Sequence, residues 1–189
     1  MKKFPGIFVL FICLVSSVSV FAQDQDMMKA WQDYMTPGEM HKILANNIGE
    51  WTAEITMWMD PSQPPTKSEG TSVTEALLDG RYFQTKYTGM IMGMPMNGIS
   101  LEGYDNAKKT FFSTWIDNMG TGIMLLEGTY DEASKTINYK GTSTDPTGKE
   151  VKVREVVKII DKDNTLFEMY TEQDGKETKS MEIKYTRKK

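Results

Sequence analysis

The chain has 189 residues, with 22 Lys and Arg against 26 Asp and Glu, one His and one Cys. This length favours a single domain, and 39% hydrophobic with 11% aromatic residues is typical of a compact folded protein and excludes a disordered chain. The formal net charge of −4 excludes the basic excess that neutralises several phosphates, so we expect no nucleic-acid partner.

Residues 1–22 have the pattern of a secretory signal peptide. Lys2 and Lys3 precede an apolar stretch, 7–15, which is shorter than the roughly 20 apolar residues that span a membrane. Small residues follow and end in Ala22, after which we expect cleavage. The protein is therefore expected to be exported to the periplasm or the extracellular space, with no membrane span after cleavage. An uncleaved N-terminal anchor is the alternative.

Cleavage would also remove the single cysteine, Cys13. The mature chain would then lack disulfides in a compartment where secreted proteins often use them. Its stability must come from a hydrophobic core, which is feasible because a domain of this size buries about 70% of the surface that its unfolded chain exposes.

The segment 23–48 is expected to be helical. Thr36 as a cap, Pro37 at the first helical position and Glu39 three residues after the threonine predict a helix start. One apolar stripe follows at helical spacing: Met40, Ile43, Leu44 and Ile48. We interpret His41, which lies on this helix, as part of a solvent-exposed face.

From Glu50 onward, apolar and polar residues alternate with a period of two, which is typical of half-buried strands. Roughly ten strands are predicted, with no strong helix pattern among them. They are expected over residues 50–59, 67–78, 81–91, 98–104, 110–118, 121–130, 136–143, 150–161, 165–172 and 177–187.

The connections between these strands are short and rich in turn residues. Hairpin or turn chemistry is found at Asp79-Gly80, Asn97-Gly98, Asp174-Gly175 and 145–148. Such short gaps leave no room for parallel crossovers, so neighbouring strands must be antiparallel.

An up-and-down series of strands with one apolar face removes its exposed edges by closing on itself. We therefore predict an all-β fold over 49–189, a single antiparallel up-and-down β-barrel of about eight to ten strands. The apolar face of the first strand begins with Trp51, and that of the last strand ends in Arg187. If these strands pair, the cation lies over the indole ring and contributes about 0.5 to 2 kcal/mol to barrel closure.

Gly49-Glu50-Trp51 resembles the G-x-W of lipocalins and related calycin barrels, in which the tryptophan commonly packs near a late Arg or Lys. Further motifs, spread over 37–188, resemble a secreted bacterial family of domains of unknown function, family 1579. These motifs are Met57-Trp58-Met59-Asp60-Pro61, Gly93-Met94-Pro95, Gly103-Tyr104-Asp105, Thr114-Trp115-Ile116-Asp117 and Tyr185-Thr186-Arg187-Lys188. The resemblance implies a lipocalin-like barrel, and it brings no catalytic residues.

Methionine is the anomaly of the composition, with 15 residues. Four of them recur at every second position: Met90, Met92, Met94 and Met96. Gly93 and Pro95 predict a break that places these side chains at a hairpin tip on the barrel rim. Three interpretations remain open: filling of an irregular interior or rim, a flexible apolar lining for a ligand, and a Cu(I) site that includes Met57 and Met59.

The chain has few residues for catalysis. His41 is the single histidine, so no pair of histidines can hold zinc, and G-x-S-x-G is absent from the sequence. We predict no metal site, no cofactor and no catalytic triad.

Glu155 interrupts an otherwise apolar strand face and is expected to point inward. Such a carboxyl needs a hydrogen-bond donor, for which the candidates are Tyr87, Tyr139, Tyr185 and Arg81. Asp117, on the same face as Trp115, is a second polar candidate. A structural network, orientation of a ligand and acid–base catalysis with Asp117 are the alternatives for Glu155.

These patterns predict a barrel that binds a small hydrophobic or amphipathic molecule without catalysis. The candidate ligand-binding residues are Trp51, Ile55, Met57, Tyr87, Met90, Met92, Met94, Trp115, Asp117, Tyr139, Glu155 and Tyr185. A structural or interaction barrel with a filled interior and a methionine-rich protein that handles copper(I) are the two alternatives.

Overall fold

The computed structural model describes residues 25–59, 63–173 and 175–189. The predicted signal peptide, with Cys13, lies outside the described residues, as does Asp174. The chain divides into two compact units, one ending at Thr36 and one beginning at Pro37. The first unit contains a helix over residues 25–35.

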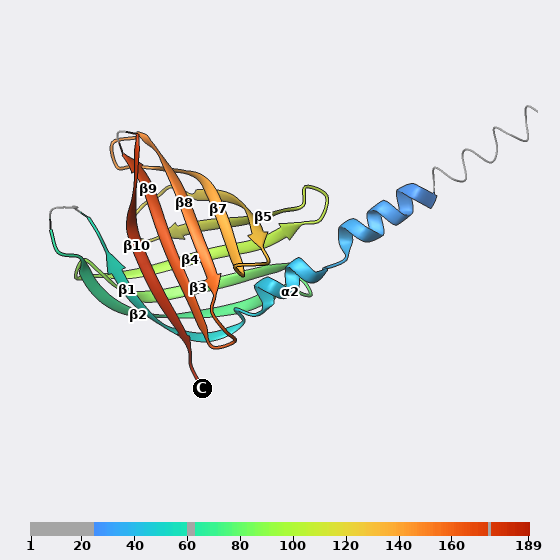
Figure 1. Ribbon diagram of the computed structural model, residues 1–189, viewed down its shortest axis with the longest axis horizontal. Coiled ribbons are helices and arrows are strands. Elements are labelled where there is room, and N and C mark those ends of the chain that lie inside the picture. The colour runs from blue at the N-terminus through green and yellow to red at the C-terminus, as the bar shows by residue number, and fades with distance from the viewer. Residues whose placement is uncertain (1–24, 60–62, 174) are drawn as a thin grey trace, which may run out of the picture. The chain divides into compact units, whose positions relative to one another are not determined.

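The second unit is a closed barrel of ten strands preceded by the short helix α2 (Glu39–Ala45) (Figure 1). The strands are β1 (Gly49–Met57), β2 (Thr66–Leu77), β3 (Tyr82–Ile91), β4 (Met94–Asp105), β5 (Thr110–Asp117), β6 (Met124–Asp131), β7 (Thr136–Thr144), β8 (Glu150–Ile159), β9 (Asn164–Gln173) and β10 (Lys176–Arg187). Each strand pairs antiparallel with its sequence neighbours, and β1 pairs with β10. The predicted fold class is confirmed.

The predicted turn at Asn97-Gly98 is wrong, because both residues lie inside β4. The hairpin between β3 and β4 turns instead at Met92-Gly93, where both residues have positive φ, 54° and 76°. Gly98 is required for packing, since a Cβ there would lie 2.2 Å from the ring of Trp115. A glycine that accommodates a ring and a glycine that makes a turn look alike in the sequence.

Pro95 is tolerated inside β4 because of its place in the hairpin. It pairs with Met90, next to the Ile91 and Met94 pair that flanks the two-residue turn. In such a hairpin the pair that flanks the turn, here Ile91 and Met94, is hydrogen-bonded, and the next pair, Met90 and Pro95, is not. The missing N–H of Pro95 therefore removes no hydrogen bond to β3. The side-chain amide of Asn118 donates to the Pro95 carbonyl at 3.1 Å.

The predicted start of the capped helix is also corrected. α2 begins at Glu39 with Gly38 as its N-cap, and Nδ1 of His41 accepts the Gly38 N–H at 3.1 Å. The Thr36 hydroxyl donates to the Gln32 carbonyl instead. The side chain that caps this helix is therefore His41 and not the expected Thr36.

His41 is buried at 6% exposure, so its interpretation as a solvent-exposed residue is wrong. The helix contacts β3 and β4, which turns His41 inward together with Leu44. The imidazole meets the ring of Tyr104 edge-on at 5.8 Å. Burial lowers the pKa of His41, so the neutral form that caps the helix is favoured.

Two clusters of buried side chains lie inside the barrel. The cluster near the helix, here the α2-side cluster, consists of Leu44, Phe83, Phe111, Leu126, Ile137, Tyr139 and Val153. The second, here the far cluster, consists of Ala53, Ile55, Tyr87, Ile91, Met96 and Ile183. The alternating strands therefore give one apolar region against the helix and another farther along the barrel.

Barrel closure joins β1 and β10 at the helix end. Trp51 pairs in register with Arg187, whose guanidinium lies 4.1 Å from the centre of the indole ring. The guanidinium also donates to the carbonyls of Asn46 at 2.6 Å and Ile48 at 2.5 Å. Gly49 has a φ of +120°, and a Cβ there would approach the guanidinium to 2.9 Å. Gly49 and Trp51, the two fixed residues of the Gly-x-Trp feature, therefore both pack against the Arg187 guanidinium.

Replacing Arg187 with Lys is expected to destabilise the barrel by about 1 to 3 kcal/mol. Lysine keeps the charge but loses the planar fork that reaches two carbonyls at once. Urea unfolding measures the difference, with Lys184→Arg on the outer face of the same strand as the control. Equal stability of Arg187→Lys and the wild type would contradict the proposed closure role.

Candidate functional site

Two glutamates and a tyrosine from three strands meet inside the barrel. Glu155 of β8 pairs in register with Tyr139 of β7. The Tyr139 hydroxyl donates to Oε1 of Glu102, on β4, at 3.3 Å. Tyr139 is fully buried and Glu155 is 6% exposed. We call Glu102 and Glu155 the glutamate pair.

The interior makes ionisation of both carboxyls costly. Burial raises the pKa of Glu102 to about 7, against the lowering effect of the Tyr139 hydrogen bond. Burial, with a smaller contribution from the charge of Glu102, raises the pKa of Glu155 to about 8. The glutamate pair therefore still holds protons at neutral pH.

Two further tyrosines, Tyr87 of β3 and Tyr185 of β10, point into the barrel. Tyr87 is 5% exposed, and its hydroxyl has no hydrogen-bond partner in the described part of the chain. The ring lies over Gly70 and Gly89, which leave room for it by lacking a Cβ. Burial raises the pKa of Tyr185, and the charges of Tyr87, Glu102 and Glu155 add to this effect.

Gly89→Ala is expected to cost about 1 to 3 kcal/mol of stability, because the new Cβ would lie 2.1 Å from the Tyr87 hydroxyl. Adding Tyr87→Phe removes that oxygen and should restore part of the loss. Thermal unfolding measures both effects. Gly120→Ala is the control, since a Cβ there meets nothing within 4 Å. Equal effects at Gly89 and Gly120 would contradict the placement of the Tyr87 ring.

Arg187 is the single cation among the described strand residues that point inward and are at least half-buried. It lies at the Trp51 end, where backbone carbonyls and Asp163 hold it. The sheet therefore contributes no other basic side chain that would neutralise the glutamate pair.

The structure distributes the predicted ligand-binding residues over several places. Five lie in or against the far cluster: Ile55, Met57, Tyr87, Trp115 and Tyr185. Tyr139 belongs to the α2-side cluster. Asp117 accepts the indole N–H of Trp115 at 2.6 Å and so orients that ring. Trp51 donates its indole N–H to the Asn47 carbonyl at 2.8 Å, at the helix end.

Met90, Met92 and Met94 are exposed at the tip of the β3–β4 hairpin, whereas Met96 is buried in the far cluster. In an up-and-down barrel, the loops after β1, β3 and β5 share one end, and α2, which precedes β1, lies at the other. Exposed apolar side chains gather on these three loops. They are Met59, Met90, Met92, Met94, Met119 and Ile123, here called the methionine rim.

Sequence reasoning missed Glu102 because the alternation of β4 is misleading. Ile99 and Leu101 suggest the buried face, yet both point outward, with Ile99 38% exposed. Ser100 and Glu102 point inward, opposite Trp115 and Ser113. The signal that identifies the inward face is Gly98, but its role depends on a ring from the next strand.

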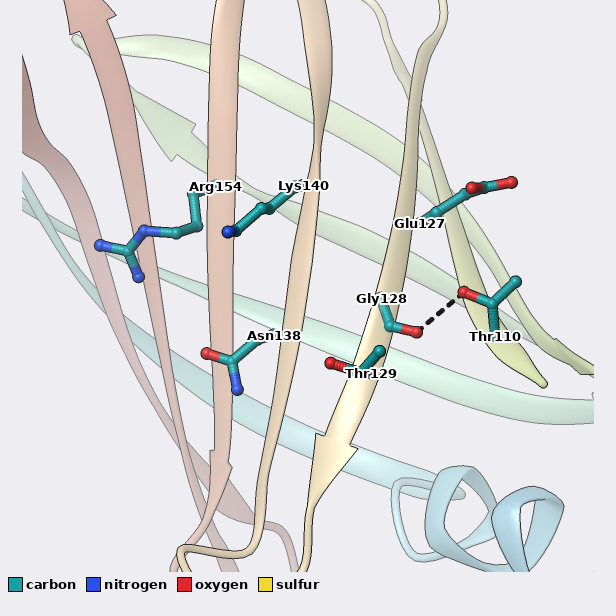
Figure 2. Close-up of a pocket in the computed structure, with 7 residues that line it drawn as sticks. All are labelled: Thr110, Glu127, Gly128, Thr129, Asn138, Lys140 and Arg154. Atoms are coloured by element: carbon teal, nitrogen blue, oxygen red, sulfur yellow. Dashed lines mark hydrogen bonds between the residues drawn. The ribbon is translucent and has the colours of Figure 1, made fainter. Parts of the chain in front are cut away.

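A concavity of about 520 Å³ lies on the outer surface of the barrel (Figure 2). Its lining residues are Thr110, Glu127, Gly128, Thr129, Asn138, Lys140 and Arg154. Arg154 is held by Glu177 at 2.7 Å and lies 3.9 Å from the centre of the Tyr170 ring. Its charge is therefore already paired, and the polar walls suit solvent.

Within residues 25–59, 63–173 and 175–189, no helix has the length and apolar character needed to cross a membrane. Across the same ranges, no three His, Cys, Asp or Glu side chains come together as metal ligands.

The closed ten-stranded antiparallel barrel, with a short helix beside one end and a cation over the first-strand tryptophan, defines a lipocalin-like β-barrel. The chain belongs to the family described as "Protein of unknown function (DUF1579)", whose sequence profile matches residues 36–187. A search of curated proteins found no match.

Among solved structures, the crystal structure of Rv2717c from M. tuberculosis is similar, with a TM-score of 0.61 and 14% identity over 82% of this chain and 100% of that chain. A redesigned beta barrel has a TM-score of 0.43 and 15% identity over 80% of this chain and 100% of its own. At this identity, the likeness to Rv2717c shows the fold alone.

Proposed function

We propose that the protein is exported from the cytoplasm and binds a small hydrophobic or amphipathic molecule inside its barrel without converting it. The export rests on the signal-peptide pattern of residues 1–22. The proposed binding rests on inward-facing side chains that keep accessible surface inside the barrel.

The observation that carries the proposal is the exposure of side chains that point inward. Six of them remain half-buried although strands close around them: Glu102, Trp115, Phe167, Met169, Met181 and Tyr185. Side chains in a filled core lose nearly all accessible surface, as Phe83 and Phe111 do at 1% exposure. Residual exposure in the interior supports space for a guest and argues against the filled-barrel alternative.

The chemistry of the interior fits an amphipathic guest. The far cluster offers aliphatic and aromatic surface, and burial of apolar area supplies about 25 cal/mol per Å². The glutamate pair and the hydroxyls of Tyr87 and Tyr185 offer polar contacts. A few convergent polar groups within a mostly apolar lining are typical of small-molecule sites.

The environment of Asp117 favours binding over acid–base catalysis. Its carboxylate accepts the Trp115 indole N–H and the Met119 backbone N–H at 2.8 Å. Asp117 thus supports a ring of the lining and is not poised against Glu155, whose electrostatic neighbour is Glu102.

Uptake of the apolar fluorophore N-phenyl-1-naphthylamine tests the proposal. The protein is expected to enhance the emission of the fluorophore and to transfer energy to it from Trp115. Trp115→Phe should reduce the transfer. Ile116→Val, an outward-facing position next to Trp115 on β5, serves as the control and should leave it unchanged. An absence of enhancement at saturating fluorophore would overturn the proposed function.

A further inference from the structure

We propose that the Tyr87 hydroxyl donates a hydrogen bond to the carbonyl oxygen of an uncharged apolar ligand held in the far cluster. This inference rests on the proposed function and adds the class of ligand. It combines two observations: a buried phenol with no hydrogen-bond partner in the described part of the chain, and the strip of small residues on which that phenol lies.

The small residues form one row across the inner wall of the barrel. Ala53 of β1 pairs with Gly70 of β2, and Gly70 pairs with Gly89 of β3. Ala53 is 1% exposed and faces the interior, so its partners in register face the interior as well. We call these three residues the small-residue row. Because adjacent strands lie about 4.8 Å apart, the row leaves a trough about 10 Å wide in the wall.

The Tyr87 side chain places its hydroxyl over this trough. A Cβ on Gly89 would lie 2.1 Å from the hydroxyl oxygen, and a Cβ on Gly70 would lie 2.3 Å from it. The backbone beneath the oxygen belongs to the ladder that joins β2, β3 and β4. Since glycine has no side chain to offer, a hydrogen-bond partner for the hydroxyl must come from the barrel interior.

The missing partner is an observation independent of the row. Tyr87 is 5% exposed, and its oxygen has no hydrogen-bond partner among residues 25–59, 63–173 and 175–189. Buried polar atoms nearly always have a partner in native proteins, so this one points to an atom supplied by a guest or by a water.

The surroundings of the row favour a guest without charge. The row continues in register to Tyr185 on β10 and to Met96 on β4. Arg187, the one cation that the described strands turn inward, is held by the carbonyls of Asn46 and Ile48. A carboxylate head at the Tyr87 hydroxyl would therefore be buried without a free cation, which is costly.

The protonation of the phenol selects a hydrogen-bond acceptor. Burial raises the pKa of Tyr87, so the phenol keeps its proton at neutral pH and can donate it to a hydrogen bond. A carbonyl oxygen accepts without bringing a donor of its own, whereas an ammonium group would bring three donors to one phenol oxygen. The complementary group is therefore a neutral carbonyl, as in a ketone, an aldehyde or an ester.

The body of the ligand has apolar surface around this hydroxyl. Trp115, Phe167 and Met181 pack against the far cluster and keep accessible surface. Aromatic and thioether groups suit a flat aromatic body. β3 runs from Tyr87 through Gly89 to the hairpin that carries part of the methionine rim. A guest that enters from the rim therefore reaches the hydroxyl before the α2-side cluster.

Competition against N-phenyl-1-naphthylamine tests the inference on the full chain, with 2-acetylnaphthalene and 2-ethylnaphthalene as probes of nearly equal size. The preference for the acetyl compound is expected to be about fivefold or more larger in the wild type than in Tyr87→Phe. Tyr87→Phe should bind the ethyl compound within about twofold of the wild type. Tyr82→Phe, on the outer face of the same strand, is the matched control and should keep the wild-type preference.

Infrared spectroscopy of bound 2-acetylnaphthalene, with an isotope label in its carbonyl, gives a second readout. A hydrogen bond weakens the carbonyl bond, so its stretching frequency should be lower in the wild type than in a hydrocarbon solvent. The frequency in Tyr87→Phe should return toward the hydrocarbon value. The comparison of the wild type with the solvent does not depend on the variant.

The outcomes separate the two proposals. If neither probe binds to the folded wild type, the proposed function fails and the inference with it. If both bind but Tyr87→Phe keeps the wild-type preference, or if the carbonyl of the wild-type complex absorbs at its hydrocarbon frequency, binding stands and the role of Tyr87 is overturned. A water is then the partner of the hydroxyl. Near-ultraviolet circular dichroism checks that Tyr87→Phe folds, which is expected because phenylalanine fills the same trough without the oxygen.

Discussion

Leu44→Ala is expected to destabilise the barrel by about 3 to 5 kcal/mol. Leu44 has 0% exposure and joins the helix to the α2-side cluster. Truncating it removes a buried side chain and leaves a cavity that the surrounding strands, fixed by their pairing, relax into only partly.

Chemical denaturation with urea measures this loss. Ile48→Ala is the matched control, because Ile48 lies a few residues away but is 40% exposed. It should cost less than about 1 kcal/mol. A similarly small cost at Leu44 would show that α2 does not contribute to the core of the barrel.

The glutamate pair is expected to make the protein less stable at alkaline pH. A carboxyl whose pKa is raised in the folded state, as for Glu102 at about 7 and Glu155 at about 8, stabilises most below its unfolded pKa near 4.5. That contribution is lost as the pH rises through the folded pKa. Between about pH 5 and 9, the pair should lose on the order of 6 kcal/mol.

Glu155→Gln isolates this effect. The variant should equal the wild type near pH 5 and exceed its free energy of unfolding by about 4 kcal/mol near pH 9. His41 acts in the opposite direction, because its pKa is lowered and its stabilisation is lost as the pH falls below about 6.5. Its contribution is common to both proteins and cancels in their difference. A difference that does not grow with pH would refute the buried state of Glu155.

Local patterns predicted the architecture because they repeat consistently along the chain. On β8, the apolar residues Val151, Val153 and Val157 share the face of Glu155, and the register places that carboxyl inward. The same reasoning places Trp51 against Arg187, since closure of an antiparallel barrel pairs the start of β1 with the end of β10. Strand ends agree to within about three residues, except at the start of β4.

Contacts between distant residues account for what the sequence could not reveal. The inward face of β4 carries Ser100 and Glu102, of which Glu102 accepts the Tyr139 hydroxyl, and the outward face carries Ile99. Within β4, the signal of this reversal is Gly98, and its role depends on the Trp115 ring of the next strand. His41 is buried because α2 docks on β3 and β4, and a seven-residue helix has too little periodicity to identify its buried side.

Native mass spectrometry of the protein purified from its own source gives the sharpest test of a guest in the barrel. We expect a retained small molecule that is released on unfolding and carries an alkyl or aromatic body. The Glu102→Gln, Glu155→Gln variant should retain less of it. A bare polypeptide mass under conditions that preserve noncovalent complexes, together with failure of the folded protein to take up an added amphiphile, would show that the barrel binds no such molecule.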